Sequence, residues 1–100
     1  MGTVIRSFAD GATEDLFNGA HTRRARQACP ELLWPIARRK LTQLNRVRHL
    51  RELAIPPGNR LERLGGDRAG QHSIRINEKY RVCFCWEGGY ADEVEVTGCH

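Results

Sequence analysis

No stretch of this sequence approaches the roughly 18–20 consecutive apolar residues that a membrane-spanning helix requires. Its first residues lack the apolar segment of a secretory signal peptide, and position 6, where a myristoylated chain carries Ser or Thr, is Arg6. The sequence also lacks internal repeats and low-complexity tracts, and its 40% hydrophobic and 28% charged residues are typical of a soluble globular protein. We therefore expect one domain over residues 1–100, located in the cytoplasm and with no membrane partner.

Cysteines are few, and they lack the spacing of a metal site. No two of them are separated by two residues, as they are in structural zinc sites. Four cysteines in a cytoplasmic chain do not indicate a disulfide framework either. Cys83 and Cys85 share one face of a predicted strand, and we expect both to be buried, inert thiols. The sequence therefore predicts neither a metal nor another cofactor.

Positive charge is concentrated in the middle of the chain. Residues 21–81 contain 15 basic and 5 acidic residues, a local net charge of +10, whereas the whole chain carries +4. Thirteen of these basic residues are arginines, whose planar guanidinium matches a phosphate group in two-point contact. This distribution favours an anionic partner, most simply a nucleic acid, although a basic surface that only faces solvent would have the same composition.

The first half of the chain has the pattern of helices. Residues 4–8 are predicted to form a short strand, and Thr13 is a suitable cap for a short helix that follows it. A longer helix is predicted to begin at Pro30, with Pro35 kinking it or delaying its start. Its apolar residues recur every three or four positions, at Leu33, Ile36, Ala37, Leu41, Leu44 and Val47.

The second half of the chain, after a turn over residues 50–55 and a loop over residues 56–59, alternates as antiparallel strands do. The apolar residues of the hairpin within residues 71–87 stay on one face only if its loop has three residues, 77–79. This register pairs Ile76 with Tyr80, Arg75 with Arg81 and Ile74 with Val82. A last strand over residues 91–96 is predicted to turn Val94 and Val96 toward the core. The fold class is therefore α+β, with helices packed on a small, mostly antiparallel sheet.

The predicted register places two like charges opposite each other, on the face away from the core. Such a pair is destabilising by up to about 1 kcal/mol. It is tolerated where acids such as Glu62 or Asp67 screen it, or where an anion binds between the two guanidinium groups. Several further arginines in the preceding segment favour the anion site. His72 shares the parity of Ile74, so we expect it to pack on the inner face and to take no part in chemistry.

The stretch over residues 56–81 resembles the HigB toxins of the RelE/ParE superfamily. The residues that carry the resemblance are Gly58-Asn59-Arg60-Leu61-Glu62, Gly66-Asp67-Arg68 and the run over residues 70–77. The match continues through Val82-Cys83-Phe84, Trp86, Val94-Glu95-Val96 and His100, so it covers essentially the whole chain. It implies a toxin of RelE-like α+β fold that cuts mRNA on translating ribosomes. It also implies inhibition by a helix-turn-helix antitoxin, HigA, and contact with DNA only through that antitoxin.

Cleavage of this kind begins with attack of the ribose 2′-OH on the adjacent phosphate. It needs one group to accept the hydroxyl proton, one to protonate the departing 5′-oxygen, and cations to stabilise the phosphorane. Arg81 and Arg75 suit the stabilising role, and the resemblance places Arg81 at the centre of the active site. His100 suits acid or base catalysis, since an unperturbed pKa of about 6.5 lets both forms exist near neutrality. Glu62 would act as a base or orient Arg63 or Arg75. RNA contacts are expected from Arg60, Arg63, Arg68 and Lys79.

Three positions depart from the family pattern. The family typically ends in Asp-Tyr-His, whereas this chain ends in Gly98-Cys99-His100, and a position that is often Lys is Gly65 here. An acid that would orient the histidine and an aromatic ring that would stack on a base are therefore missing, which predicts a weakened nuclease. The alternatives are an inactive module that only binds antitoxin or RNA, and a ParE-like inhibitor of DNA gyrase. The paired arginines and His100 favour the nuclease.

Overall fold

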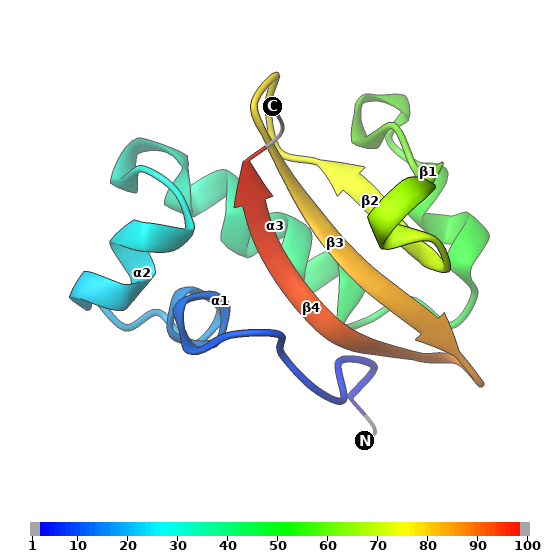
Figure 1. Cartoon of the computed structure of the whole chain (residues 1–100), viewed down its shortest axis with the longest axis horizontal. Coiled ribbons are helices and arrows are strands. Elements are labelled where there is room, and N and C mark those ends of the chain that lie inside the picture. Colours follow the sequence, from blue (N-terminus) through cyan, green and yellow to red (C-terminus); the bar gives the residue numbers. More distant parts are fainter. Residues whose placement is uncertain (1–2, 99–100) are drawn as a thin grey trace.

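The structure is a computed structural model, and it describes residues 3–98. Helices fill the first half of the chain and strands the second half (Figure 1). The helices are α1 (Gly11–Phe17), α2 (Arg23–Ala28) and α3 (Trp34–Leu44), with short 3₁₀-helices η1 (Glu31–Leu33), η2 (Leu50–Ala54), η3 (Pro57–Asn59) and η4 (Gly66–Arg68). The strands are β1 (Glu62–Arg63), β2 (Gln71–Arg75), β3 (Tyr80–Glu87) and β4 (Tyr90–Gly98).

The strands form one antiparallel sheet in the order β1-β2-β3-β4. Helix α3 runs behind this sheet, and α1 and α2 lie beside β4 (Figure 1). The predicted α+β class is thus confirmed. The core fills the space between helices and sheet, and its fully buried residues include Leu16, Leu41, Leu44, Leu53, Ile74, Val82, Phe84 and Val94. No helix within the described residues is both long and apolar enough to cross a membrane.

The register between β2 and β3 is the predicted one, with Arg75 opposite Arg81 and Ile74 opposite Val82. The hairpin closes through Ile76, whose backbone N–H donates to the carbonyl of Tyr80 at 2.9 Å. Within the loop, the side-chain oxygen of Asn77 accepts the backbone N–H groups of Lys79 and Tyr80, both at 2.8 Å. A side chain of this kind replaces the backbone partners that a three-residue loop leaves without hydrogen bonds.

The predicted helix starts need correction. Asp10, and not Thr13, caps α1: its carboxylate accepts the backbone N–H of Thr13 at 2.8 Å. Thr13 is instead fully buried, and its hydroxyl accepts the backbone N–H of Val96 at 2.9 Å, which joins α1 to β4. The helix expected from Pro30 begins with η1, and regular α-helix starts only at Trp34. Pro35 explains the delay. Proline has no N–H, so it fits the first turn of an α-helix, where that group has no partner, but it would break a helix that had begun several residues earlier.

The strand predicted over residues 4–8 is also incorrect, since that segment only makes isolated parallel bridges to β4, from Ile5 to Ala91 and from Phe8 to Val94. The predicted strand beside it is confirmed, and Val94 and Val96 are buried. Between the two bridges β4 carries an extra residue, Glu93, in a left-handed conformation with φ +54°. Its N–H donates to the hydroxyl of Ser7 at 2.9 Å, so the ladder is interrupted there.

Candidate functional site

The sheet face opposite the core, called the outer face below, carries the predicted arginines. Side chains alternate along a strand, and the core takes Ile74, Val82 and Phe84. The remaining positions therefore form the outer face: Gln71, Ser73 and Arg75 on β2, Arg81, Cys83 and Cys85 on β3, and Glu95 and Thr97 on β4. The two predicted catalytic arginines thus occupy one surface, next to the short strand β1.

The guanidinium of Arg81 is held at three points. Its Nε donates to the hydroxyl of Ser73 at 2.8 Å, and its Nη2 donates to the backbone carbonyl of Arg60 at 3.1 Å. The same Nη2 lies 3.3 Å from a carboxylate oxygen of Glu62. Only 16% of the Arg81 side chain is exposed, whereas Glu62 is 50% exposed. A long side chain that normally samples many rotamers is therefore fixed in one orientation on the sheet.

Glu62 has a more specific partner than the sequence indicated. It was expected to act as a base or to orient Arg63 or Arg75, but its ion pair is with Arg81. This pair explains how the sheet tolerates two opposed arginines, because one of them is compensated by the acid that was expected to screen it. Arg75 instead donates from Nε to the backbone carbonyl of Asn77 at 3.1 Å. No acid within residues 3–98 forms an ion pair with Arg75.

Arg68 reaches across the outer face from η4. It donates to the side-chain oxygen of Gln71 on β2 and to the carboxylate of Glu95 on β4, each at 3.0 Å. Because β3 lies between these two strands, the guanidinium crosses β3, where Cys83 is 2% exposed. The prediction that Cys83 is buried is confirmed, whereas Cys85 is partly exposed. The Arg68 side chain therefore shields part of β3 from solvent, and its positive charge lies near the site.

Two of the predicted RNA-binding residues are not part of the cluster around Arg81. Arg63 follows Glu62 on β1 and is opposite His72, so alternation along the strand directs its side chain to the inner face, away from Glu62. Lys79 is exposed at the tip of the β2–β3 hairpin. His72 contacts the ring of Phe84 on the inner side, with centroids 6.0 Å apart. Burial, aided by the Arg63 charge, lowers the pKa of His72 below its usual value. These contacts agree with a packing role for His72.

The remaining candidate, His100, lies outside the described residues. Among the residues that are described, no group of three or more His, Cys, Asp or Glu side chains is placed to bind a metal ion. The outer face offers guanidinium groups, the half-exposed carboxylate of Glu62 and the hydroxyl of Ser73, whereas its second carboxylate, at Glu95, is bound to Arg68.

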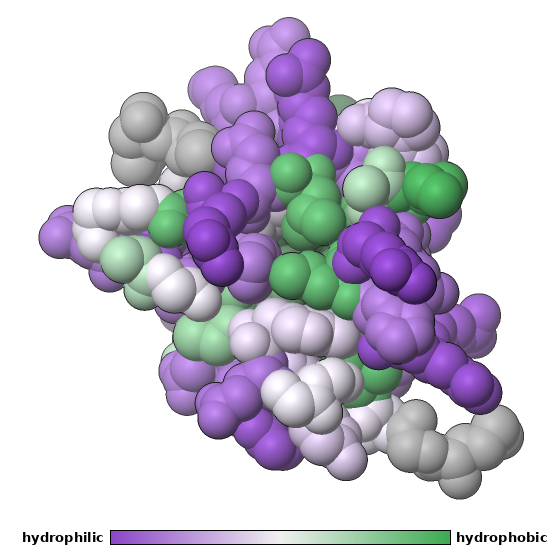
Figure 2. Space-filling model, turned by 90° about the vertical axis from the view of Figure 1, so that its right-hand side faces the viewer, coloured by the Kyte–Doolittle hydropathy of each residue, from purple (hydrophilic) through white to green (hydrophobic). Residues whose placement is uncertain are grey.

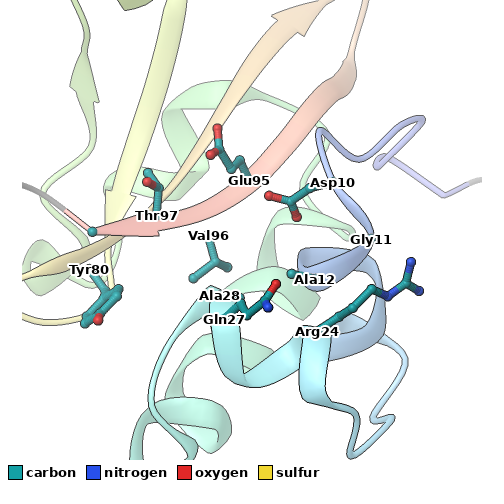
Figure 3. A pocket seen from close by; sticks show the side chains of 11 residues that line it. Asp10, Gly11, Ala12, Arg24, Gln27, Ala28, Tyr80, Glu95, Val96 and Thr97 are labelled. Atoms are coloured by element: carbon teal, nitrogen blue, oxygen red, sulfur yellow. The ribbon is translucent and has the colours of Figure 1, made fainter.

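A cleft of about 510 Å³, separate from the cluster around Arg81, lies between α1, α2 and β4 (Figure 3). Tyr80 and Val96 line it from the sheet, and Arg24 and Gln27 line it from α2. The guanidinium of Arg24 is bound to Asp15 through two hydrogen bonds, of 3.0 and 2.8 Å. This pairing leaves the cleft without an uncompensated cation for a phosphate, so we place the candidate site on the outer face.

The side of the molecule that bears β1 supports this placement. Figure 2 shows this side: hydrophilic side chains project around its rim, and hydrophobic side chains occupy its middle. The turn beside β1 leaves Ile55 71% exposed and Arg60 exposed to solvent. This side of the molecule therefore presents a cation and aliphatic surface next to the outer face.

Two parts of the site were missed from sequence. Ser73 is diagonal to Arg81 on the same face, a relation that the predicted register already contained. The carbonyl of Arg60 had no such signal. It is aimed at Arg81 because Arg60 adopts a left-handed conformation, with φ +46° and ψ +58°, which few residues other than glycine adopt.

Known proteins share both the sequence and the fold of this chain. The family model of HigB-like toxins, described as RelE-like toxins of type II toxin-antitoxin systems, matches residues 6–97. Toxin HigB-1 of Vibrio cholerae serotype O1 (strain ATCC 39315 / El Tor Inaba N16961) is 47% identical over 53 residues, which are 53% of this chain and 56% of that toxin. The chain thus matches a little over half the length of that relative.

A solved structure, the YoeB-YefM complex from Staphylococcus aureus, contains a chain of similar fold. The TM-score is 0.52 at 17% identity, over 96% of this chain and 94% of the other. At this identity the likeness concerns the fold, which is RelE-like. Since the family model spans nearly the whole sequence, the chain belongs to the HigB-like toxins, the RelE-like toxins of type II toxin-antitoxin systems.

Proposed function

We propose that the protein is a ribosome-dependent mRNA endoribonuclease and that a HigA-type antitoxin neutralises it. The observation that supports this most directly is the fixed guanidinium of Arg81 on the outer face. A cation that is already oriented stabilises the negative charge of a phosphorane without reorganising during the reaction. Arg75, directly opposite on β2, supplies a second cation for the same phosphate.

Proton transfer in this proposal belongs to Glu62 and His100. The carboxylate of Glu62 is half exposed and next to Arg81, so it faces the side from which a ribose would approach. It is placed to accept the proton of the 2′-OH, while His100 protonates the departing 5′-oxygen or exchanges roles with Glu62. The exposed cations Arg60 and Lys79 extend the contact to neighbouring phosphates.

Partners follow from the same proposal. The substrate is mRNA bound to the ribosome, with its phosphodiester against the outer face. The HigA-type antitoxin would be a helix-turn-helix protein, and contact with DNA would arise only through it. No part of the proposed reaction requires a metal or an organic cofactor, because the cations and proton-transfer groups are side chains.

Mapping of mRNA 5′ ends after induced expression tests this function. We expect new 5′ ends within translated regions, which disappear when a HigA-type antitoxin is co-expressed. Growth arrest without new 5′ ends would contradict the nuclease. Arrest with trapped DNA gyrase would then indicate the ParE-like alternative, and no arrest would indicate a module that only binds antitoxin or RNA.

RNA binding in the absence of ribosomes should weaken steeply as salt rises. Each neutralised phosphate releases counterions, so the log–log slope changes by roughly −0.7 per contact for a single strand. Anisotropy of a labelled, non-cleavable RNA measures this slope. Arg60→Gln should make the slope shallower by about 0.7, whereas Arg24→Gln, whose guanidinium is already bound to Asp15, should leave it unchanged. A flat salt response of the unmodified protein would contradict the predicted RNA contact.

The altered tail should make cleavage slow in a way that can be reversed. We expect the double change Gly98→Asp and Cys99→Tyr to increase the single-turnover cleavage rate. Asp would raise the basicity of His100 and hold it in place, and Tyr would offer a stacking surface that contributes about 1–3 kcal/mol, or roughly tenfold in affinity. The structure accommodates the new acid, since a Cβ at Gly98 would lie 3.5 Å from Tyr80 Cε1, an ordinary contact. Adding His100→Ala should erase the gain. If the restored tail cuts no faster, either Gly98 and Cys99 do not limit the rate or His100 is not at the site. An unchanged rate in His100→Ala alone would establish the second explanation and make Glu62 the leading group for proton transfer.

A further inference from the structure

A buried asparagine fixes the loop that leads into the site. Asn59, at the end of η3, is fully buried. Its side-chain nitrogen donates to the backbone carbonyls of Leu53 at 3.0 Å and Ile55 at 3.3 Å, and to the side-chain oxygen of Gln43 at 3.0 Å. The side-chain amide of Asn59 thereby connects the two ends of the turn over residues 53–59 by hydrogen bonds. Breaking this set would leave polar groups buried without partners.

The remaining atom of that amide is bound by a lysine of helix α3. The ammonium of Lys40 donates to the side-chain oxygen of Asn59. Lys40 and Gln43 are three residues apart, so they project from one side of α3. The partly buried position of Lys40, with Arg39 as a lesser cause, lowers the pKa of its ammonium below the usual value. Helix α3 therefore binds the loop through two side chains, the ammonium of Lys40 and the amide of Gln43.

The loop enters the outer face directly after this anchor. Arg60, the next residue, holds the left-handed conformation that aims its carbonyl at Arg81 Nη2. This conformation is unfavourable for a residue with a side chain, so it persists only where neighbouring contacts hold it. The contacts immediately before Arg60 are those of Asn59. Two residues after Arg60 comes Glu62, the other partner of Arg81.

We propose that Lys40 is a positioning residue for Arg81: through Asn59 it holds the backbone of Arg60 in the conformation that orients the catalytic guanidinium. The consequence for cleavage rests on the proposed nuclease function, whereas the effect on Arg81 does not. Lys40 itself makes no contact with the outer face. Its influence passes through two hydrogen bonds, from Lys40 to the side chain of Asn59 and from Arg81 to the backbone carbonyl of Arg60, which are joined by the peptide link between Asn59 and Arg60.

The test compares Lys40→Met with Arg39→Met in the full chain. Both variants remove one positive charge from adjacent positions of α3, but only the first removes the donor to Asn59. The first measurement is the ¹⁵N NMR signal of the Arg81 side chain, which reports its hydrogen bonds without reference to activity. We expect the exchange of the Arg81 side-chain N–H protons with water to accelerate several-fold in Lys40→Met, and to stay unchanged in Arg39→Met. Lys40→Arg should restore the original exchange rate.

The second measurement is single-turnover cleavage on programmed ribosomes over a range of ribosome concentrations. Small misplacements of a catalytic group are costly, so we expect Lys40→Met to lower the saturated rate constant roughly ten- to a hundredfold at an unchanged half-saturating concentration. Amide spectra of each variant report whether it is folded. An unperturbed Arg81 signal in folded Lys40→Met would overturn the proposal. A perturbed signal, with no cleavage even by the unmodified protein, would uphold the positioning role and reject the nuclease function.

Discussion

Replacing Arg81 with alanine is expected to abolish mRNA cleavage while leaving the protein folded. The guanidinium lies on the outer face, and Arg81 is not part of the apolar core, so its loss leaves the packing of the core in place. In the proposed mechanism, what is lost is the oriented cation beside the reacting phosphate. Removal of one preorganised group that stabilises a transition state typically lowers the rate about 10²–10³-fold, and we expect at least the lower of these values. Single-turnover cleavage on programmed ribosomes measures the effect.

Two companion variants make this prediction specific. Arg75→Ala removes the same charge from the opposite strand, but among residues 3–98 the hydrogen bond that holds the Arg75 side chain is the one to the carbonyl of Asn77, so its loss should slow cleavage less. Arg81→Lys keeps the charge and loses the planar fork that contacts Ser73 and Arg60 together, so it should remain strongly impaired. Cleavage and growth arrest by Arg81→Ala at the level of the unmodified protein would remove Arg81 from the active site.

The pairing behind these predictions was available in the sequence. Strict alternation in residues 71–87 leaves few ways to keep the apolar residues on one face, and a three-residue loop then sets Arg75 opposite Arg81. The core strand at the end of the chain followed from the same rule. Helix α2 was missed because only two alanines, Ala25 and Ala28, face the core from it. Residues this small give an amphipathic pattern too weak to recognise.

The support of the site depends on contacts that periodicity does not contain. Lys40 and Asn59 are 19 positions apart, and Gln43 and Asn59 are 16 apart, on elements with different periods. The left-handed backbone of Arg60 is equally hidden, since arginine has no preference for it. Resemblance to a family pointed to the segment over residues 56–81, but it did not indicate that this segment orients Arg81 through a backbone carbonyl. Local rules thus predicted which residues face outward, and tertiary contacts determined how they are held.

The largest expected effect on stability comes from the opposite face of the same strand. Phe84 is fully buried on β3, between the rings of His72 and Trp86, with centroid distances of 6.0 and 6.4 Å. Phe84→Ala should lower the free energy of unfolding by about 3–5 kcal/mol, because it removes a large apolar group and leaves a cavity that close packing cannot fill. Urea unfolding followed by circular dichroism measures the change.

Tyr90→Ala is the matched control, because it also removes an aromatic ring from the sheet. Tyr90 is 43% exposed, and its main contact is the Arg6 guanidinium, 4.8 Å from the ring centroid. An exposed contact of this kind contributes about 0.5–1 kcal/mol, so the control should lose little stability. A small domain has only about 5–15 kcal/mol in total, so Phe84→Ala should also lose toxicity, through a depleted folded population. Arg81→Ala should lose toxicity while it remains folded. An equal loss of stability in Phe84→Ala and Arg81→Ala would contradict our inference that one face of β3 serves the core and the other the site.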